Sequence, residues 1–201
     1  MRRIPIGALT SSGAALAGFR ELLSRGGVAA VPTETFYGLA ADPRDEAAVR
    51  RVVAAKGRDD SKALPVVFSR PGDLAGLGVA MPEETLAPYL RIWPAALTVV
   101  VAIREPLAAS RGAFKLAVRM PAWPPLRDLL AFTGPLTATS ANRSGESPVD
   151  DPEMVERIFE GSIDLLVDGG RTPGGEPSTV LDATESPPRV LRAGAFPWPG
   201  K

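Results

Sequence analysis

The stretch Gly26-Gly-Val-Ala-Ala-Val-Pro-Thr-Glu-Thr-Phe-Tyr-Gly-Leu39 joins a short apolar run to a polar segment. The residues Val28 to Val31 are apolar throughout, which is typical of a strand buried inside an α/β protein. Helix-like segments lie on both sides of this strand, one ending at Arg25 and one running from Asp45 to Lys56. This alternation predicts an α/β fold.

Both flanking segments have apolar residues at helical spacing. In the first, Ser11 or Ser12 is suited to be the N-cap. The apolar face that follows consists of Leu16, Phe19, Leu22 and Leu23. The corresponding face of the second consists of Ala48, Val49, Val52 and Val53. Gly57 follows at the position where a glycine commonly ends a helix. We therefore expect two amphipathic helices packed against the sheet.

The rest of the chain continues the alternation. Further helices are expected at 83–92, 125–132 and 152–159. Further strands are expected at 64–68, 97–103, 116–119, 136–139, 165–168, 179–182 and 190–192. Pro65 favours a strand start or an edge, because proline cannot donate a ladder hydrogen bond. The irregular order predicts a twisted mixed sheet with flanking helices, in one domain spanning 1–201.

Composition restricts the chemistry. The chain has no histidine and no cysteine, so imidazole catalysis, disulfides and Cys-ligated zinc are excluded. Lys+Arg and Asp+Glu both number 23, so the formal net charge is zero and a nucleic-acid role would need a local basic patch. Positioning of phosphates and carboxylates remains open to such a chain.

The N-terminus is only weakly similar to a secretory signal. Met1-Arg2-Arg3 precedes an apolar stretch, but Pro5, Gly7 and the polar segment from Thr10 interrupt it. No stretch of the sequence approaches the length of a membrane-spanning helix. We therefore expect a cytoplasmic protein.

Polar residues follow the first buried strand. In an extended chain, Thr33 and Thr35 would point to one side and Glu34 to the other. Two such hydroxyls could bind a small polar ligand, although threonine is also a common strand residue. Spacing alone supports both interpretations equally.

Five cations lie near the ends of expected elements, and they are Lys56, Arg58, Lys62, Arg119 and Arg192. Basic residues at a helix C-terminus are also common for dipole reasons alone. Ligands of open α/β sheets bind near strand ends, so these cations could form an anion site.

A small-residue turn contains Ser140 and Asn142 after an expected strand. These residue types often close turns onto their own backbone, and they can also build an anion-binding concavity. The hydroxyls of Ser178 and Thr179 follow a glycine-rich loop. The sequence has no Walker A motif, so a P-loop nucleotide site is excluded.

Six short motifs together resemble one family. They are Pro32-Thr-Glu-Thr-Phe-Tyr-Gly-Leu39, Lys56-Gly-Arg58, Val118-Arg-Met-Pro121, Thr139-Ser-Ala-Asn142 with Ser144-Gly145, Ser178-Thr-Val180 and Leu191-Arg192. Their order resembles that of the YrdC-like threonylcarbamoyl-AMP synthases, in the short single-domain form. The resemblance covers roughly residues 10–194.

The resemblance implies a reaction. The amine of L-threonine takes up bicarbonate or CO2, and the carbamate attacks the α-phosphate of ATP to form threonylcarbamoyl-AMP and pyrophosphate. A downstream tRNA threonylcarbamoyl transferase complex uses the product to modify adenosine 37. The resemblance also implies a YrdC-like twisted sheet with a concave basic groove.

The resemblance further implies residue roles. The catalytic clamp would be Lys56, Arg58, Ser140 and Asn142. The threonine pocket would contain Thr33, Thr35, Arg119 and Ser178, and ATP would contact Arg58, Lys62, Ser140 and Arg192. Mg²⁺ would be carried on the phosphates without a protein metal site. Arginine suits the threonine carboxylate because its fork makes two parallel hydrogen bonds.

Two points remain open in the sequence. Some relatives place a histidine near the position of Val67, and this chain has none. A non-catalytic YrdC-like factor that binds RNA, including double-stranded RNA, during ribosome maturation is the alternative function. The zero net charge weakens that alternative, although the same cations could contact structured RNA.

Overall fold

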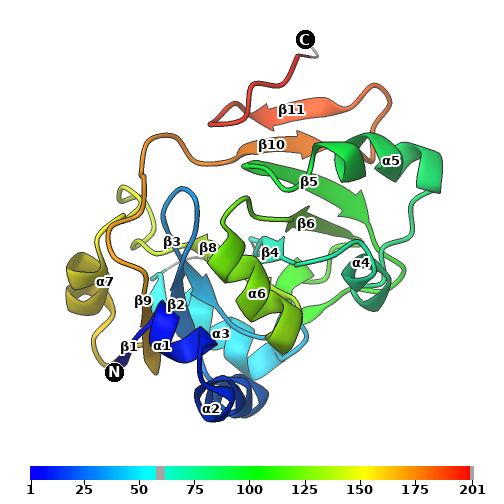
Figure 1. Ribbon diagram of the computed structural model, residues 1–201. Coiled ribbons are helices and arrows are strands. Elements are labelled where there is room, and N and C mark those ends of the chain that lie inside the picture. Colours follow the sequence, from blue (N-terminus) through cyan, green and yellow to red (C-terminus); the bar gives the residue numbers. More distant parts are fainter. Residues whose placement is uncertain (58–61, 200–201) are drawn as a thin grey trace.

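The strands divide between two sheets in this computed structural model, which describes residues 1–57 and 62–199 (Figure 1). The strands are β1 (Arg2–Pro5), β2 (Ala29–Pro32), β3 (Tyr37–Ala40), β4 (Val66–Val67), β5 (Leu97–Ala102), β6 (Lys115–Arg119), β7 (Leu136–Thr137), β8 (Thr139–Ser140), β9 (Leu165–Asp168), β10 (Thr179–Asp182) and β11 (Arg189–Arg192). The helices are α1 (Ile6–Thr10), α2 (Gly13–Ser24), α3 (Glu46–Ala55), α4 (Asp73–Gly76), α5 (Glu83–Ile92), α6 (Pro124–Thr133) and α7 (Pro152–Phe159), with a 3₁₀ turn η1 (Ala108–Ser110).

Both sheets are mixed. The five-stranded sheet has the order β1-β9-β2-β3-β8, in which β9 runs parallel to both β1 and β2 while β3 is antiparallel to β2 and β8. The six-stranded sheet has the order β11-β10-β5-β6-β4-β7, with parallel pairs β10–β5 and β4–β6. The expected α/β class with mixed pairing is confirmed. The division into two sheets was not apparent from the order of elements.

The chain crosses from one sheet to the other at Ala138. A single strand was expected over 136–139, but β7 pairs with β4 in one sheet and β8 pairs with β3 in the other. The N–H of Ala138 donates to Pro65 O at 2.8 Å, outside both ladders. A Cβ on Gly38 would lie 3.4 Å from Ala138 Cα, so the backbone of β3 passes directly beside the crossing. The crossing carries Ser140 to the space between the sheets.

The helices flanking the first buried strand are confirmed. Ser12 caps α2 by accepting a hydrogen bond from Ala15 N, and Asp45 caps α3 by accepting from Ala47 N and Ala48 N. Gly57 has φ of +58°, the left-handed conformation that a glycine adopts at little cost. The predicted apolar face of α3 is fully buried. These local signals act within a few residues, which is why the sequence revealed them.

Several short elements were missed, and they are β1, α1, β3, α4 and η1. The strand β1 occupies the edge of the five-stranded sheet and is mostly exposed, so it has no apolar run to indicate it. The expected strand over 64–68 is reduced to β4, which begins directly after Pro65. No helix within residues 1–57 and 62–199 is long and apolar enough to cross a membrane.

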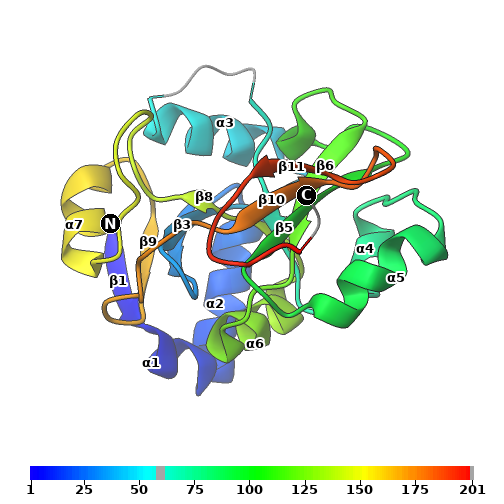
Figure 2. The same cartoon turned by 90° about the horizontal axis from the view of Figure 1, so that it is seen from above.

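Apolar packing forms two clusters. The helices α1, α2 and α6 pack against one another and cover one face of the five-stranded sheet (Figures 1 and 2). Their side chains Leu9, Phe19 and Leu126 are buried in this cluster. The second cluster includes strands of both sheets and the buried face of α3. The two sheets are therefore joined through a shared core, which holds facing strand ends at a constant distance.

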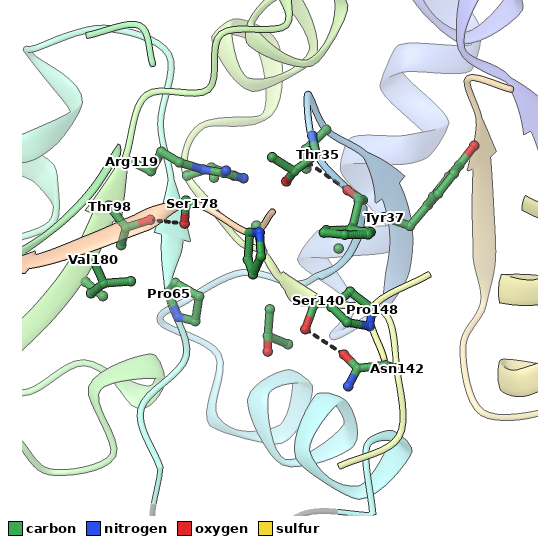
Figure 3. A pocket seen from close by; sticks show the side chains of 18 of the residues that line it. Thr35, Tyr37, Pro65, Thr98, Arg119, Ser140, Asn142, Pro148, Ser178 and Val180 are labelled. Atoms are coloured by element: carbon green, nitrogen blue, oxygen red, sulfur yellow. Dashed lines mark hydrogen bonds between the residues drawn. The ribbon is translucent and has the colours of Figure 1, made fainter. Parts of the chain in front are cut away.

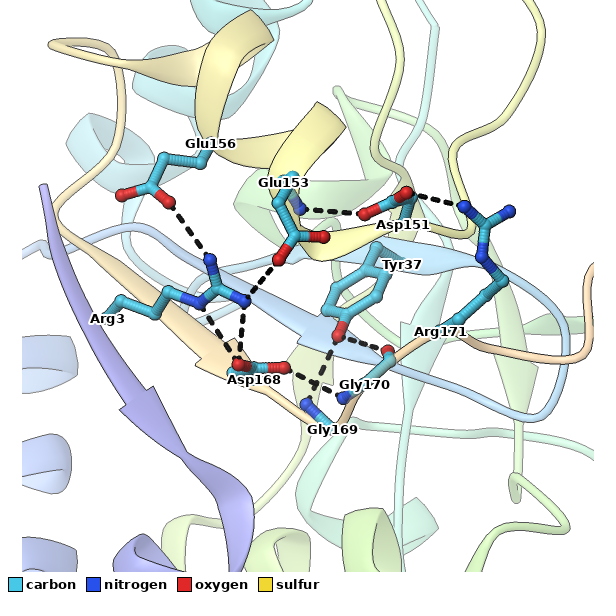
Figure 4. A network of polar contacts seen from close by, with 9 residues as sticks. All are labelled: Arg3, Tyr37, Asp151, Glu153, Glu156, Asp168, Gly169, Gly170 and Arg171. Carbon is cyan, nitrogen blue, oxygen red and sulfur yellow. Dashed lines mark hydrogen bonds and ion pairs between the residues drawn. The ribbon is translucent and has the colours of Figure 1, made fainter.

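A polar network ties the N-terminal strand to the loop after β9 (Figure 4). Arg3 contacts Asp168 at 2.8 Å, and it also pairs with Glu153 and Glu156 of α7. The hydrogen bonds that Arg3 donates to Glu153 and Asp168 raise the pKa of Arg3. Asp168 also accepts the Gly170 N–H at 2.8 Å. The network fixes the turn that begins the connection to β10.

Tyr37 contributes a buried phenol to the same turn. Its hydroxyl donates to Gly170 O at 2.7 Å and accepts the Gly169 N–H at 3.1 Å. We expect Tyr37→Phe to lower the free energy of unfolding by about 1–3 kcal/mol, because both backbone groups lose a buried partner. Chemical denaturation at pH 7 measures the change, and an unchanged unfolding midpoint would contradict it.

The same phenol predicts a pH dependence. Burial raises the pKa of Tyr37 from 10.0 to about 12. Between these values the unfolded chain has lost the phenolic proton while the folded protein keeps it, so the unfolding free energy falls as pH rises through this window. The variant Tyr37→Phe should lack this part of the fall. Denaturation of both proteins from pH 9 to pH 12 gives the difference.

Candidate active site

A pocket of about 420 Å³ lies between the two sheets (Figure 3). One wall carries Thr35, Ser140 and Asn142, which belong to β8 and to loops that follow β2 and β8. The opposite wall is formed by the strand ends of the six-stranded sheet and includes Thr98, Arg119, Ser178 and Val180. The pocket therefore combines side chains that are distant in sequence.

Four of the five predicted cations line this pocket, and they are Lys56, Lys62, Arg119 and Arg192. The fifth, Arg58, lies outside the described residues. Among the residues that the structure describes, no aspartate or glutamate lines the cavity. Such a lining attracts anions, because each cation acts here with less screening than it would in bulk water.

Lys56 ends α3 and is only 4% exposed. Its Nζ donates to Ser140 O at 2.5 Å, to Asn142 O at 3.0 Å and to Asn142 Oδ1 at 3.2 Å. In return, Ser144 N donates to Lys56 O at 2.8 Å. Lys56 thus brings a buried positive charge to the pocket and at the same time holds the turn that follows β8.

Ser140 and Asn142 are bonded to each other within that turn. The Ser140 hydroxyl donates to Asn142 Oδ1 at 2.5 Å, and Asn142 Nδ2 donates to Arg143 O and Glu146 O at 2.8 Å (Figure 3). Gly145 lines the pocket with φ of +88°. The turn-closing interpretation is confirmed, and the same turn forms a polar wall of the pocket. Anion binding by this turn stays a prediction.

Thr33 and Thr35 both line the pocket on a bend between β2 and β3. The Thr33 hydroxyl donates to Phe36 O at 2.7 Å, so the 3.1 Å contact between the two hydroxyls is donated by Thr35. The carbonyl of Thr35 accepts from Thr172 Oγ1 and Gly174 N. Thr33 is occupied in shaping the bend, whereas the Thr35 oxygen keeps acceptor capacity for a ligand.

Arg119 ends β6, a strand with neighbours on both sides in the six-stranded sheet. It is 6% exposed, and its guanidinium points into the pocket (Figure 3). Nη1 of Arg119 lies 3.0 Å from Oε1 of Glu34, a residue of the bend between β2 and β3 that does not itself line the pocket. Val67 of β4 is the register partner of Arg119 and lines the pocket as well, so an apolar side chain lies beside the Arg119 position.

Ser178 is held by two pocket residues. Its Oγ shares a 2.8 Å hydrogen bond with Thr98 Oγ1 (Figure 3), while Arg192 donates to Ser178 O through Nε and Nη2 at 3.1 and 2.7 Å. Burial of the guanidinium, and after it the positive charge of Arg119, lowers the pKa of Arg192. The neighbouring Thr179 does not join the pocket, because its hydroxyl donates to Phe196 O at 2.6 Å.

Sequence reasoning missed Thr98, Glu34 and the pocket role of Ser144. Thr98 alternates with the fully buried Leu97 and Val99, which places its side chain on the other face of β5. That alternation was a usable signal. No sequence signal indicated the contacts of Thr98 with Ser178 and of Glu34 with Arg119, since the partners of each pair are about eighty residues apart.

Comparison with known proteins identifies the family. The Sua5/YciO/YrdC family model, described as telomere recombination, matches residues 21–194. The chain belongs to this family. Within it, the chain is 39% identical to the threonylcarbamoyl-AMP synthase of Pyrococcus abyssi over 178 residues, which is 87% of this chain and 52% of that protein.

Other members of the Sua5/YciO/YrdC family show similar likeness. The threonylcarbamoyl-AMP synthase of Thiobacillus denitrificans is 37% identical, with 88% of this chain and 94% of that protein covered. The crystal structure of P. abyssi Sua5 complexed with L-threonine has a TM-score of 0.87 at 34% identity, with 98% of this chain and 58% of that chain covered. The chain thus spans about half the length of some of its curated family relatives, and nearly the whole length of another.

Proposed function

We propose that this protein is a threonylcarbamoyl-AMP synthase that uses ATP, L-threonine and bicarbonate or CO2. The observation that carries this proposal is the gathering of Lys56, Lys62, Arg119 and Arg192 with hydroxyls from both sheets around one pocket. Support also comes from relatives that bear this name at 37–39% identity. We further propose that residues 1–201 act as a single domain.

The nucleotide phosphates would lie at the Lys56 end of the pocket. Lys56 supplies a buried charge fixed by three acceptors of the β8 turn, and Lys62 and Arg192 add further positive charge along the cavity. Ser140 adds hydroxyl lone pairs on the same wall. Charges fixed before the reaction stabilise a developing negative charge more effectively than mobile ones, because no reorganisation is needed.

L-Threonine would lie at the Arg119 end. Its carboxylate would take the guanidinium fork of Arg119, which is aimed into the cavity from a strand paired on both sides. Thr35 and Ser178 would contact the polar atoms of the amino acid, with Thr33 maintaining the bend that positions Thr35. Val67 and Val180 would form an apolar surface for the threonine methyl group.

The chemistry then needs positioning and little proton transfer by the protein. The neutral amine of threonine bonds to the carbon of CO2 and releases one proton to water. One carbamate oxygen bonds to the α-phosphorus of ATP while the bond from that phosphorus to the bridging oxygen breaks, and pyrophosphate leaves. The pocket contributes by holding the two anionic reactants together against their repulsion.

Mg²⁺ fits this pocket only as a companion of the nucleotide. The described lining residues supply cations, hydroxyls and amides but no carboxylate, and Mg²⁺ is ordinarily held by carboxylates, phosphates and water. We therefore propose that ATP phosphates and water carry the ion. The ion would supply further neutralisation of the phosphate charge, while Ser140 and Lys56 keep the turn beside it in place.

The defining experiment measures pyrophosphate release from ATP by the purified protein. Release should require both L-threonine and bicarbonate, and mass spectrometry should detect threonylcarbamoyl-AMP. Equal release without threonine, or none with all substrates and Mg²⁺ present, would refute the proposal. L-Serine in place of L-threonine is a matched control, because it lacks only the methyl group that would face Val67 and Val180.

We propose that the product passes to a tRNA threonylcarbamoyl transferase in the cytoplasm. The alternative of a non-catalytic RNA-binding factor is not favoured, since the relatives are named for an enzymatic activity. Direct RNA contact is not required by the proposed reaction. A salt-dependent affinity for tRNA that persists in Lys56→Ala would instead support the RNA-binding alternative.

A further inference from the structure

Glu34 is a buried carboxylate directly beside the predicted threonine ligand Arg119. The side chain of Glu34 is 14% exposed, and both of its carboxylate oxygens are shielded from solvent. Within residues 1–57 and 62–199, neither oxygen receives a hydrogen bond of acceptable geometry. The 3.0 Å approach of Arg119 Nη1 is therefore an ion pair by distance but not an aligned hydrogen bond.

A buried carboxylate without aligned hydrogen bonds contributes little to the stability of the folded protein. A buried ion pair contributes little to stability unless its geometry is excellent and the remaining lone pairs are satisfied. The pair also joins two distant parts of the fold, since Glu34 comes from the bend after β2 and Arg119 from the end of β6. Arg119 lines the pocket, and Glu34 lies behind it, outside the lining. Ligand recognition therefore accounts better than stability for a charge at Glu34.

The charge has a clear electrostatic effect at this end of the cavity. Arg119 and Arg192 both line the pocket, so two guanidinium groups share the region. Burial, and after it the charge of Arg119, lowers the pKa of Arg192. Without Glu34 they would form a site of two positive charges, which suits a phosphate dianion. With Glu34 the region carries a net charge close to one, which matches a single carboxylate.

We propose that Glu34 determines the specificity of the Arg119 subsite by making it accept a monoanionic carboxylate and reject phosphate. The identity of that carboxylate as L-threonine rests on the proposed function. An enzyme that must bind a triphosphate and an amino acid in one cavity needs such a device, because phosphate would otherwise compete for every cation in it. Glu34 supplies the repulsive element.

The test compares Glu34→Gln with the wild-type protein, since glutamine preserves the shape and removes the charge. Calorimetric titration with inorganic phosphate at constant ionic strength should show about tenfold or greater tightening in the variant, because a repulsive buried charge has been removed. Phosphate should also compete with L-threonine in the variant and not in the wild type. Glu176→Gln makes the same change at an exposed position and should have no such effect.

The outcomes separate the two proposals. Absence of L-threonine binding to the wild-type protein would refute the proposed function, while the direct phosphate titration would still test Glu34. Unchanged phosphate affinity in Glu34→Gln, with no competition against threonine, would overturn the specificity role. A merely structural residue would not change which anion competes with the amino acid.

A stability comparison provides a second measurement that needs no ligand. Arg119→Gln should lower the melting temperature strongly, because it leaves the Glu34 carboxylate buried without a counter-charge. The double variant Glu34→Gln with Arg119→Gln should recover much of that loss. A double variant no more stable than Arg119→Gln would show that Glu34 is not the charge partner of Arg119 and would overturn the proposal.

Discussion

Lys56→Met is expected to reduce kcat/KM for pyrophosphate release by roughly 10²–10³-fold, the usual effect of losing one preorganised electrostatic group. Methionine resembles the lysine stem in length but has no charge and no N–H donors. The substitution leaves Ser140 O, Asn142 O and Asn142 Oδ1 without their contacts to Nζ. The turn that forms one wall of the pocket would then lose both its charge and its anchor.

Steady-state kinetics with ATP, L-threonine and bicarbonate measure this effect, and circular dichroism establishes that the variant is folded. Lys115→Met is the matched control, because Lys115 is half-exposed and pairs with Asp182 away from the pocket. It should leave kcat/KM nearly unchanged, since neither Lys115 nor Asp182 lines the pocket. A folded Lys56→Met protein with near wild-type turnover would remove Lys56 from the catalytic clamp.

Arg119→Lys is expected to raise the KM for L-threonine by about 10–100-fold with a much smaller change in the KM for ATP. Lysine keeps the charge but replaces a planar fork with a single ammonium group, so one charge-assisted hydrogen bond to the carboxylate is lost. Arg119 ends β6, a strand that lies between β5 and β4, and its register partner is Val67 of β4. Because the strand is held in the sheet, it cannot move to restore the hydrogen bond that the lysine ammonium group fails to make.

Separate titrations of each substrate at saturating levels of the other distinguish the two KM values. Arg50→Lys makes the same change on the exposed face of α3, where Arg50 pairs with Glu46, and should leave both KM values unchanged. Equal increases in both KM values would remove Arg119 from the threonine subsite. An increase confined to ATP would reverse the proposed arrangement of the pocket.

The lining of the pocket is consistent with catalysis that needs no histidine. Its described lining offers hydroxyls, amides and four cations, and none of these is an ordinary general base at neutral pH. Catalysis by alignment and charge neutralisation is compatible with such a set. The role predictions for Lys56, Arg58, Ser140 and Asn142 remain predictions, and Arg58 lies outside the described residues.

Local signals in the sequence determined much of the fold. Three local features were predicted: the buried strand beginning near Val28, the helix capped by Asp45, and the end of that helix at Gly57. Each depends only on neighbours within one helical turn or one strand. Family motifs added the candidate residues around Ser140 and Arg119, and the structure brings these into one pocket. Helix caps and side-chain periodicity depend only on residues that are close in sequence, so these helices and strands could be predicted.

The tertiary structure alone decided how these parts meet. The crossing at Ala138 is held by a hydrogen bond to Pro65 O and lies beside Gly38, and both residues are far away in the chain. The ion pair of Glu34 with Arg119 joins the bend between β2 and β3 of the five-stranded sheet to β6 of the six-stranded sheet. Such contacts result from the packing of the two sheets around a shared core. Glu34 and Arg119 are eighty-five residues apart, so the local sequence pattern could not predict that their charges lie close together.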